Sequence, residues 1–170
     1  MNPLYLGDAA DIAKRFFCAT LAELGYTVYV DPMFTGAWSG EDEAYGRFIG
    51  ATHILHHDPS QGESALFFDP DTGVRDTQTS AHVSYDRLAQ ALDAHPLVMA
   101  YDQAFSRGAD PRGQMVEKLA QMQSRQCPGF YYDALARFLF VAREPARLAK
   151  LEALLCALGL PERRLVHLPA

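Results

Sequence analysis

Three aspartates, Asp31, Asp69 and Asp102, each follow directly on a run of apolar residues that is typical of a buried strand. In an open α/β sheet, ligands bind in the crevice outside the carboxyl ends of the strands. Carboxylates at such ends could accept hydrogen bonds from a ligand or hold a metal ion. The pattern therefore indicates that the three could converge on one crevice and that at least two of them are functional. The alternative is that each aspartate simply begins a turn.

The second aspartate opens the segment Asp69-Pro70-Asp71-Thr72-Gly73. Pro70 stiffens the turn between two carboxylates, and Gly73 permits a positive φ or the close approach of a ligand. We predict that Asp69 and Asp71 are catalytic and interact with an amine, a hydroxyl or a metal; the alternative is an aspartate-rich turn. Two ionised carboxylates so close together should repel each other. Asp69→Asn is therefore expected to relieve repulsion and leave the fold intact while it removes ligand binding.

Helical patterns and short apolar runs alternate along the chain. Strands are predicted at 26–30, 65–68, 97–101, 137–142 and 164–168, with a short strand or turn at 52–55. Helices are predicted at 8–24, 41–49, 84–94, 112–124 and 145–158, with Asp8 and Ser84 as N-caps and Gly25 and Gly159 as stops. This alternation predicts an α/β fold, a Rossmann-like three-layer αβα sandwich with a mainly parallel sheet. The length fits a single domain over 1–170.

The composition is typical of a globular protein. Hydrophobic residues make up 49% and charged residues 21%, which excludes a disordered chain, a collagen-like repeat and a coiled coil. The net charge of −6 argues against nonspecific nucleic-acid binding over a broad basic surface, although it leaves room for a local basic patch. Cys18 and Cys156 are predicted to be buried thiols. Because the N-terminus does not resemble a signal peptide and no apolar stretch could span a membrane, we expect a cytoplasmic protein.

Several common catalytic signatures do not occur in the sequence. The first predicted strand leads into DPMFTG (31–36), which is not G-x-G-x-x-G, and there is no G-x-x-x-x-G-K-[ST] motif or G-x-S-x-G elbow. A Rossmann dehydrogenase, a P-loop NTPase and an α/β serine hydrolase are therefore disfavoured. His53, His56, His57 and Asp58 are suitable metal ligands. Since no second ligand cluster accompanies them, an exposed polar turn is the favoured interpretation.

The order of three motifs resembles that of class I S-adenosylmethionine-dependent methyltransferases, nearest to the compact ribosomal-RNA adenine-N6 methyltransferases. Leu6–Lys14 (LGDAADIAK) is similar to the family's A-G-N-x-A-D-x-x-K segment, which helps to hold the methionine part of the cofactor. Residues 31–36 stand in place of the D-x-x-A-G-x-G loop that follows the first strand. Asp69–Thr72 stands in place of the D-P-P-Y motif at the end of the fourth strand. In the family, that motif accepts hydrogen bonds from the target amine and stacks its tyrosine on the flipped base.

The resemblance implies a methyltransferase-like protein that binds S-adenosylmethionine and acts on or binds nucleic acid. It implies cofactor binding by Gly7, Asp8, Lys14, Asp31 and Gly36, and catalysis by Asp69 and Asp71. Asp71 replaces the second proline of the family motif and Thr72 replaces the aromatic, which removes a stacking platform worth about 1–3 kcal/mol per base. The segment between the first strand and Asp69 is also shorter than in the family.

Two other classes of function fit the same residues. A Mg²⁺-dependent phosphodiesterase or nuclease would hold the metal through carboxylates and neutralise the phosphate with a cation. Its residues would be Asp31, Asp69, Asp71 and Asp102, with Lys14 or Arg107 for the phosphate. A non-catalytic module would instead bind a protein partner through Phe130, Tyr131 and Tyr132 in a predicted loop. The alternative for this cluster is packing onto the core.

Overall fold

The computed structural model describes residues 6–35, 42–106 and 110–169. Its strands are β1 (Thr27–Asp31), β2 (Thr52–His53), β3 (Ser64–Phe68), β4 (Gly73–Arg75), β5 (His82–Ser84), β6 (Leu97–Tyr101), β7 (Gly129–Tyr132), β8 (Phe138–Ala142) and β9 (Leu165–His167). Its helices are α1 (Ala9–Glu23), α2 (Asp42–Ile49), α3 (Tyr85–Ala91), α4 (Pro111–Ser124) and α5 (Pro145–Ala157). Short 3₁₀ turns are η2 (Ile54–His56), η3 (Pro59–Gln61) and η4 (Glu162–Arg164).

A seven-stranded sheet with the order β2-β1-β3-β6-β8-β7-β9 forms the centre of the molecule. The ladders β1–β2, β1–β3 and β3–β6 are parallel, whereas β6–β8, β8–β7 and β7–β9 are antiparallel. Strands β2, β1, β3, β6 and β7 therefore run in one direction, and β8 and β9 run in the other. The predicted α/β fold with a mainly parallel sheet is confirmed.

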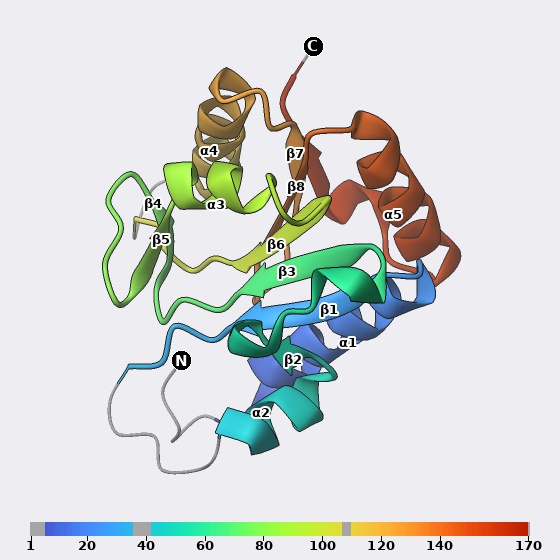
Figure 1. Cartoon of the computed structure of the whole chain (residues 1–170). Coiled ribbons are helices and arrows are strands. Elements are labelled where there is room, and N and C mark those ends of the chain that lie inside the picture. Colours follow the sequence, from blue (N-terminus) through green and yellow to red (C-terminus); the bar gives the residue numbers. More distant parts are fainter. Residues whose placement is uncertain (1–5, 36–41, 107–109, 170) are drawn as a thin grey trace.

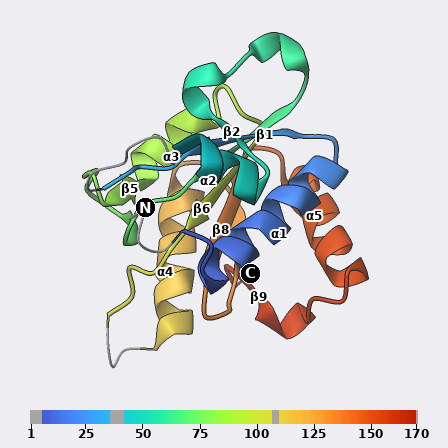
Figure 2. The same cartoon turned by 90° about the horizontal axis from the view of Figure 1, so that it is seen from below.

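Helices cover both faces of this sheet (Figure 1). On one face, α1, α2 and α5 enclose a hydrophobic cluster that includes Leu21, Ile49 and Leu151. On the other face, α3 and α4 enclose a cluster that includes Leu88 and Leu119. Figure 2 shows α1 and α5 side by side on the first face. Because both faces are covered, every residue of β3 and β6 is buried, as expected of continuous apolar strands.

Most predicted helix ends agree with the structure, although α3 ends at Ala91 rather than near Ala94. The Asp8 side chain accepts hydrogen bonds from two backbone N–H groups of the first turn of α1, and the Ser84 side chain caps α3 in the same way. Gly25 and Gly159 follow their helices with φ of 92° and 91°, which glycine adopts without strain. These local signals are sufficient to set where α1, α3 and α5 begin or end.

Two features of the fold differ from expectation. Residues 129–132, predicted to lie in a loop, form β7, because they pair with β8 on one side and β9 on the other. The short β4–β5 ladder was not predicted either.

The two cysteines predicted to be buried differ in the structure. Cys18 is buried as predicted, but Cys156 is exposed. The buried face of α5 consists of Leu148, Leu151 and Leu155, and the next position along the helix points away from the sheet.

Among the residues described, no helix combines the length and the apolar character that a membrane crossing requires.

A buried histidine at the start of β6 predicts a pH-dependent stability. Ser64 Oγ lies 2.8 Å from His95 Nδ1, and the ring of His57 packs 4.6 Å from the His95 ring. Burial, with a smaller contribution from His57, lowers the pKa of His95 to about 4. The unfolded chain takes up this proton near pH 6.5, so stability falls as the pH drops from there towards 4. We expect His95 to account for a loss of about 2 kcal/mol between pH 7 and pH 5.

Urea denaturation at these two pH values measures this effect. His95→Gln keeps a hydrogen-bonding partner for Ser64 and cannot titrate, so its free energy of unfolding should change less with pH than that of the wild type. His56→Gln replaces an exposed histidine and should keep the wild-type difference. An unchanged pH dependence in His95→Gln would contradict the assignment.

Candidate functional site

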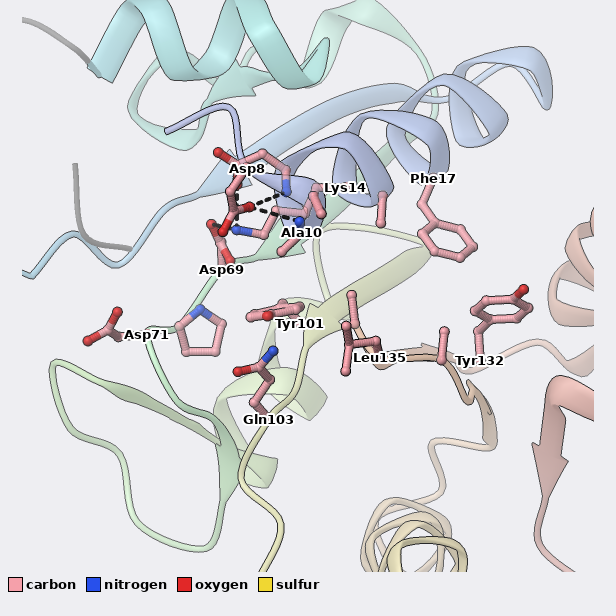
Figure 3. Close-up of a pocket in the computed structure, with 16 residues that line it drawn as sticks. Asp8, Ala10, Lys14, Phe17, Asp69, Asp71, Tyr101, Gln103, Tyr132 and Leu135 are labelled. Carbon is pink, nitrogen blue, oxygen red and sulfur yellow. Dashed lines mark hydrogen bonds and ion pairs between the residues drawn. The ribbon is translucent and has the colours of Figure 1, made fainter. Parts of the chain in front are cut away.

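A cavity of about 640 Å³ opens at the carboxyl ends of β3 and β6. It lies between the first turns of α1 and the turn that joins β7 to β8 (Figure 3). Its lining comprises Asp8, Ala9, Ala10, Asp11, Ala13, Lys14, Phe17, Asp69, Pro70, Asp71, Tyr101, Gln103, Tyr132, Ala134, Leu135 and Ala136. The predicted residues Asp8, Lys14, Asp69 and Asp71 are therefore brought together at one site.

The N-terminus of α1 lies at this cavity, and side chains of the same segment cap its backbone N–H groups. Asp8 Oδ1 accepts from the backbone N–H groups of Ala10 at 2.8 Å and Asp11 at 3.0 Å. Asp11 Oδ2 in turn accepts from the Gly7 N–H at 2.8 Å. The arrangement is similar to a capping box, but the Asp11 side chain accepts from the residue that precedes the N-cap rather than from the N-cap itself. It leaves Asp8 exposed at the cavity mouth and turns Asp11 inward.

Lys14 bridges two buried carboxylates behind this cap. Its Nζ donates to Asp11 Oδ1 and to Asp69 Oδ2, each at 2.9 Å. Tyr45 of α2 donates its hydroxyl to the same Asp69 oxygen. The ring centroid of Tyr101 lies 4.8 Å from Lys14 Nζ. Lys14 thus joins α1 to the end of β3, and Tyr45 adds α2 to the same cluster.

The charges in this cluster stabilise one another. Burial lowers the pKa of Lys14, but the charges of Asp69 and Asp11 and their hydrogen bonds outweigh it and raise the pKa overall. Burial raises the pKa of Asp69, while Lys14 and Tyr45 act against that rise. Burial and the Asp69 charge raise the pKa of Tyr45 well above its usual value. We expected repulsion between Asp69 and Asp71 to be the main unfavourable interaction at this site. The main unfavourable term is instead the free-energy cost of burying the Asp69 carboxylate, and the ion pair with Lys14 offsets that cost.

The other two strand-end aspartates also bind cations of their own. Asp31 pairs with Arg87 of α3. Asp102 Oδ2 accepts from Lys118 of α4 at 2.6 Å and from the Tyr131 hydroxyl at 2.7 Å. The prediction that these carboxylates converge on one crevice is wrong, because only Asp69 lines the cavity. Each one instead anchors a different helix to the sheet.

The alternation of side chains along a strand explains this division. In β3, Phe67 packs with α1 and α5, so the side chain two positions later, that of Asp69, points to the same face. In β1 and β6, Tyr29 and Ala100 pack on the opposite face, with α3 and α4. Asp31 and Asp102 follow two positions after them and point there as well. Their backbones share one edge of the sheet, but their side chains do not share one face.

Of the other described residues that were predicted to act in a site, Tyr132 lines the cavity, whereas Gly73, Phe130 and Tyr131 do not. Gly36 and Arg107 lie outside the described residues. Gly73 has a φ of 121°, and the group that approaches it closely is the Asp102 carboxylate, since a Cβ at Gly73 would lie 2.2 Å from Asp102 Oδ1. Phe130 and Tyr131 are fully buried and cannot present a surface to a partner.

Nothing in the described part of the chain forms a metal site. Those residues hold no group of three or more His, Cys, Asp or Glu side chains that could bind a metal ion. His53 accepts a hydrogen bond from the Leu55 N–H, and the His57 ring packs against His95. Asp31, Asp69 and Asp102 each pair with a lysine or an arginine. No observation favours the Mg²⁺-dependent phosphodiesterase.

The cavity has two chemically different ends (Figure 3). Asp8, Asp69 and Asp71 lie at one end, whereas Phe17 and Tyr132 lie at the other. The Phe17 and Tyr132 rings pack edge to face, with centroids 5.4 Å apart.

The sequence analysis missed part of the lining. Tyr101 and Gln103 flank Asp102 at a strand end, which is the signal that could have indicated them. Phe17 and Leu135 carried no such signal, because they reach the cavity only through the packing of α1 beside the β7–β8 turn.

Comparison of the chain with protein-family models, with curated proteins and with solved structures gives no match.

The bridging role of Lys14 predicts that Asp69 stabilises the fold. Asp69→Asn leaves Lys14 buried with one carboxylate instead of two, so we expect a loss of roughly 3 kcal/mol in the free energy of unfolding. The matched control is Asp71→Asn, an exposed residue of the same turn, which should change stability by about 0.5 kcal/mol or less. Chemical denaturation measures both. An Asp69→Asn variant as stable as the wild type would instead support relief of repulsion.

A second prediction concerns the close contact at Gly73. Gly73→Ala places a methyl group against Asp102 Oδ1 and must displace the carboxylate that holds Lys118. Gly62 has a similar positive φ of 88°, but a Cβ there would meet nothing within 4 Å. We expect Gly73→Ala to destabilise the protein by about 2 kcal/mol more than Gly62→Ala in thermal or chemical unfolding. Equal effects would show that backbone strain alone accounts for the loss.

Proposed function

We propose that the protein binds an elongated organic cation in the cavity beside α1. S-adenosylmethionine, the cofactor that the sequence resemblance implies, belongs to this chemical class. The observation that carries the proposal is the two-ended lining, with carboxylates at one end and aromatic rings at the other. The position supports it as well, because ligands of open α/β sheets bind outside the carboxyl ends of the strands.

The acidic end favours a positive charge. Four aspartates and one lysine line it: Asp8, Asp11, Asp69, Asp71 and Lys14. Lys14 bridges two of the aspartates, and among the described lining residues the carboxylates outnumber the cations. A partly enclosed pocket with charge of one sign concentrates ligands of the other sign. A sulfonium or ammonium group therefore suits this end.

The aromatic end favours a flat or apolar group. Phe17, Tyr101 and Tyr132 offer ring surfaces, and the side-chain amide of Gln103 offers both a donor and an acceptor. A volume of about 640 Å³ lies within the range of pockets that hold drug-sized ligands. The adenine of S-adenosylmethionine could stack here while its charged groups face the carboxylates.

The strand order supports the resemblance. The dinucleotide-binding fold has the strand order 3-2-1-4-5-6. If its outer strand 3 is removed, the next four strands have the same arrangement as β2-β1-β3-β6. The flavodoxin-like order 2-1-3-4-5 contains this arrangement as well. With that strand missing, β3 corresponds to the fourth strand of the family, and Asp69 follows it as the D-P-P-Y counterpart would. The shortened segment between β1 and Asp69 agrees with the loss of one strand.

The predicted cofactor residues fit this ligand in part. Gly7, Asp8 and Lys14 lie at or next to the acidic end, whereas Asp31 lies on the opposite face with Arg87. When bound, S-adenosylmethionine supplies an activated methyl group. Asp69, which the resemblance assigns to the acceptor amine, is bound to Lys14 and Tyr45. The proposal is therefore one of binding, and a nucleic-acid substrate stays a prediction of the resemblance.

Calorimetric titration tests the proposal with a pair of ligands that differ in charge. S-adenosylmethionine should bind more tightly than its demethylated product, because the product has a neutral thioether in place of the sulfonium. Asp71→Asn should weaken the binding of S-adenosylmethionine by roughly fivefold, or about 1 kcal/mol, by removing one carboxylate from the mouth. Asp86→Asn, an exposed aspartate outside the lining, is the control and should bind as the wild type does. The absence of heat with either ligand at millimolar concentration would refute the proposal.

A further inference from the structure

Large apolar side chains are exposed on both sides of the cavity mouth. Leu135, on the β7–β8 turn, is 90% exposed although it lines the cavity. On α1, Ile12 is 60% exposed and Phe16 is 36% exposed. Contiguous exposed apolar surface commonly marks a binding site.

The apolar face of α1 continues from this surface into the cavity. Ala9, Ile12, Ala13 and Phe16 are spaced i, i+3, i+4 and i+7, which places them on one face of the helix. Ala9 and Ala13 of this face line the cavity, together with the neighbouring Phe17. The helix therefore forms one apolar lip. The β7–β8 turn, with Ala134, Leu135 and Ala136, forms the other.

We propose that this groove docks a segment of another protein that presents a lysine between apolar side chains. The lysine enters the cavity towards the acidic end, and its apolar neighbours cover Leu135, Ile12 and Phe16. The inference rests on the proposed function, because it uses the same acidic end for the cation. The two proposals differ in the molecule that supplies the positive charge. A small ligand held inside the cavity would leave both apolar lips exposed, whereas a docked protein segment would cover them.

Charge and shape both favour this partner. Asp8 and Asp71 are exposed at the mouth, and the whole chain carries a net charge of −6, so a basic segment is attracted over a distance. A lysine carries a compact ammonium on a flexible apolar stem. That stem can lie along the apolar lips while the ammonium reaches the carboxylates. The rings of Phe17, Tyr101 and Tyr132 add favourable surfaces for a cation in the same cavity.

Fluorescence anisotropy with short labelled peptides tests the inference on the full-length protein. One peptide carries a central lysine flanked by leucines, and its matched control carries norleucine in place of the lysine; both have blocked termini. We expect the lysine peptide to bind about tenfold more tightly than the norleucine peptide. Unlabelled S-adenosylmethionine should displace it, because both need the acidic end.

A pair of surface variants separates docking from small-molecule binding. Ile12→Ser, on the α1 lip but outside the cavity lining, should weaken the lysine peptide by about fivefold or more and leave the binding of S-adenosylmethionine unchanged. Leu55→Ser is the control: Leu55 is 83% exposed on η2, outside the cavity lining, and its replacement should change neither.

Each outcome decides between the two proposals. Equal binding of the two peptides, or equal effects of Ile12→Ser and Leu55→Ser on the lysine peptide, overturns the docking inference. Binding of S-adenosylmethionine without binding of the lysine peptide overturns docking and keeps the proposed function. Binding of the peptide alone keeps docking and removes S-adenosylmethionine as the ligand. Sedimentation of the unliganded protein covers one further occupant: a dimer that Leu135→Ser dissociates would assign the groove to a second copy of the chain and overturn the inference.

Discussion

The arrangement of the site depends on one buried ammonium, that of Lys14, held between Asp11 and Asp69. Burying a charge is costly unless it is paired and hydrogen-bonded, so the three side chains must come together for any of them to be buried. Their meeting fixes the first turn of α1 against the end of β3, and the Tyr45 hydroxyl adds α2 to the same point. This cluster of two carboxylates and one ammonium, counted over the described residues, forms part of the acidic end of the cavity.

Ion pairs between an aspartate at a strand end and a cation on a helix also occur at the neighbouring strands β1 and β6. Asp102 holds Lys118 of α4 with the help of Tyr131, and Asp31 holds Arg87 of α3. Both faces of the sheet are thus joined to their helices by ion pairs at the edge where ligands bind in folds of this class. Carboxylates that would be expected to serve chemistry serve structure instead. The exposed acids at the mouth, Asp8 and Asp71, are the ones placed to meet a ligand.

This division of roles bears on the resemblance to methyltransferases. The resemblance rests on the order of the motifs, and the segment between β1 and Asp69 is shorter than the family pattern implies. However, the aspartate that would receive the acceptor amine is bound to Lys14 and Tyr45, and the aromatic surfaces of the site come from α1, β6 and β7 rather than from Thr72. The acidic and aromatic ends of the cavity are the reason that we propose recognition of a cation rather than methyl transfer to a base.

The sequence by itself determined the five helices, most strands of the central sheet, their order and several of their ends. Leu97–Tyr101 has the same bounds in the structure as in the prediction, and Asp8 and Ser84 cap the helices that they were expected to cap, because strand runs and caps depend on residues close together in the chain. Only the tertiary structure decided which face each strand-end aspartate points to, that residues 129–132 pair as β7, and that Phe17 and Leu135 meet at one cavity. Each of these depends on which distant segments lie side by side. Lys14 and Asp69 are separated by 55 positions, and no local pattern connects them.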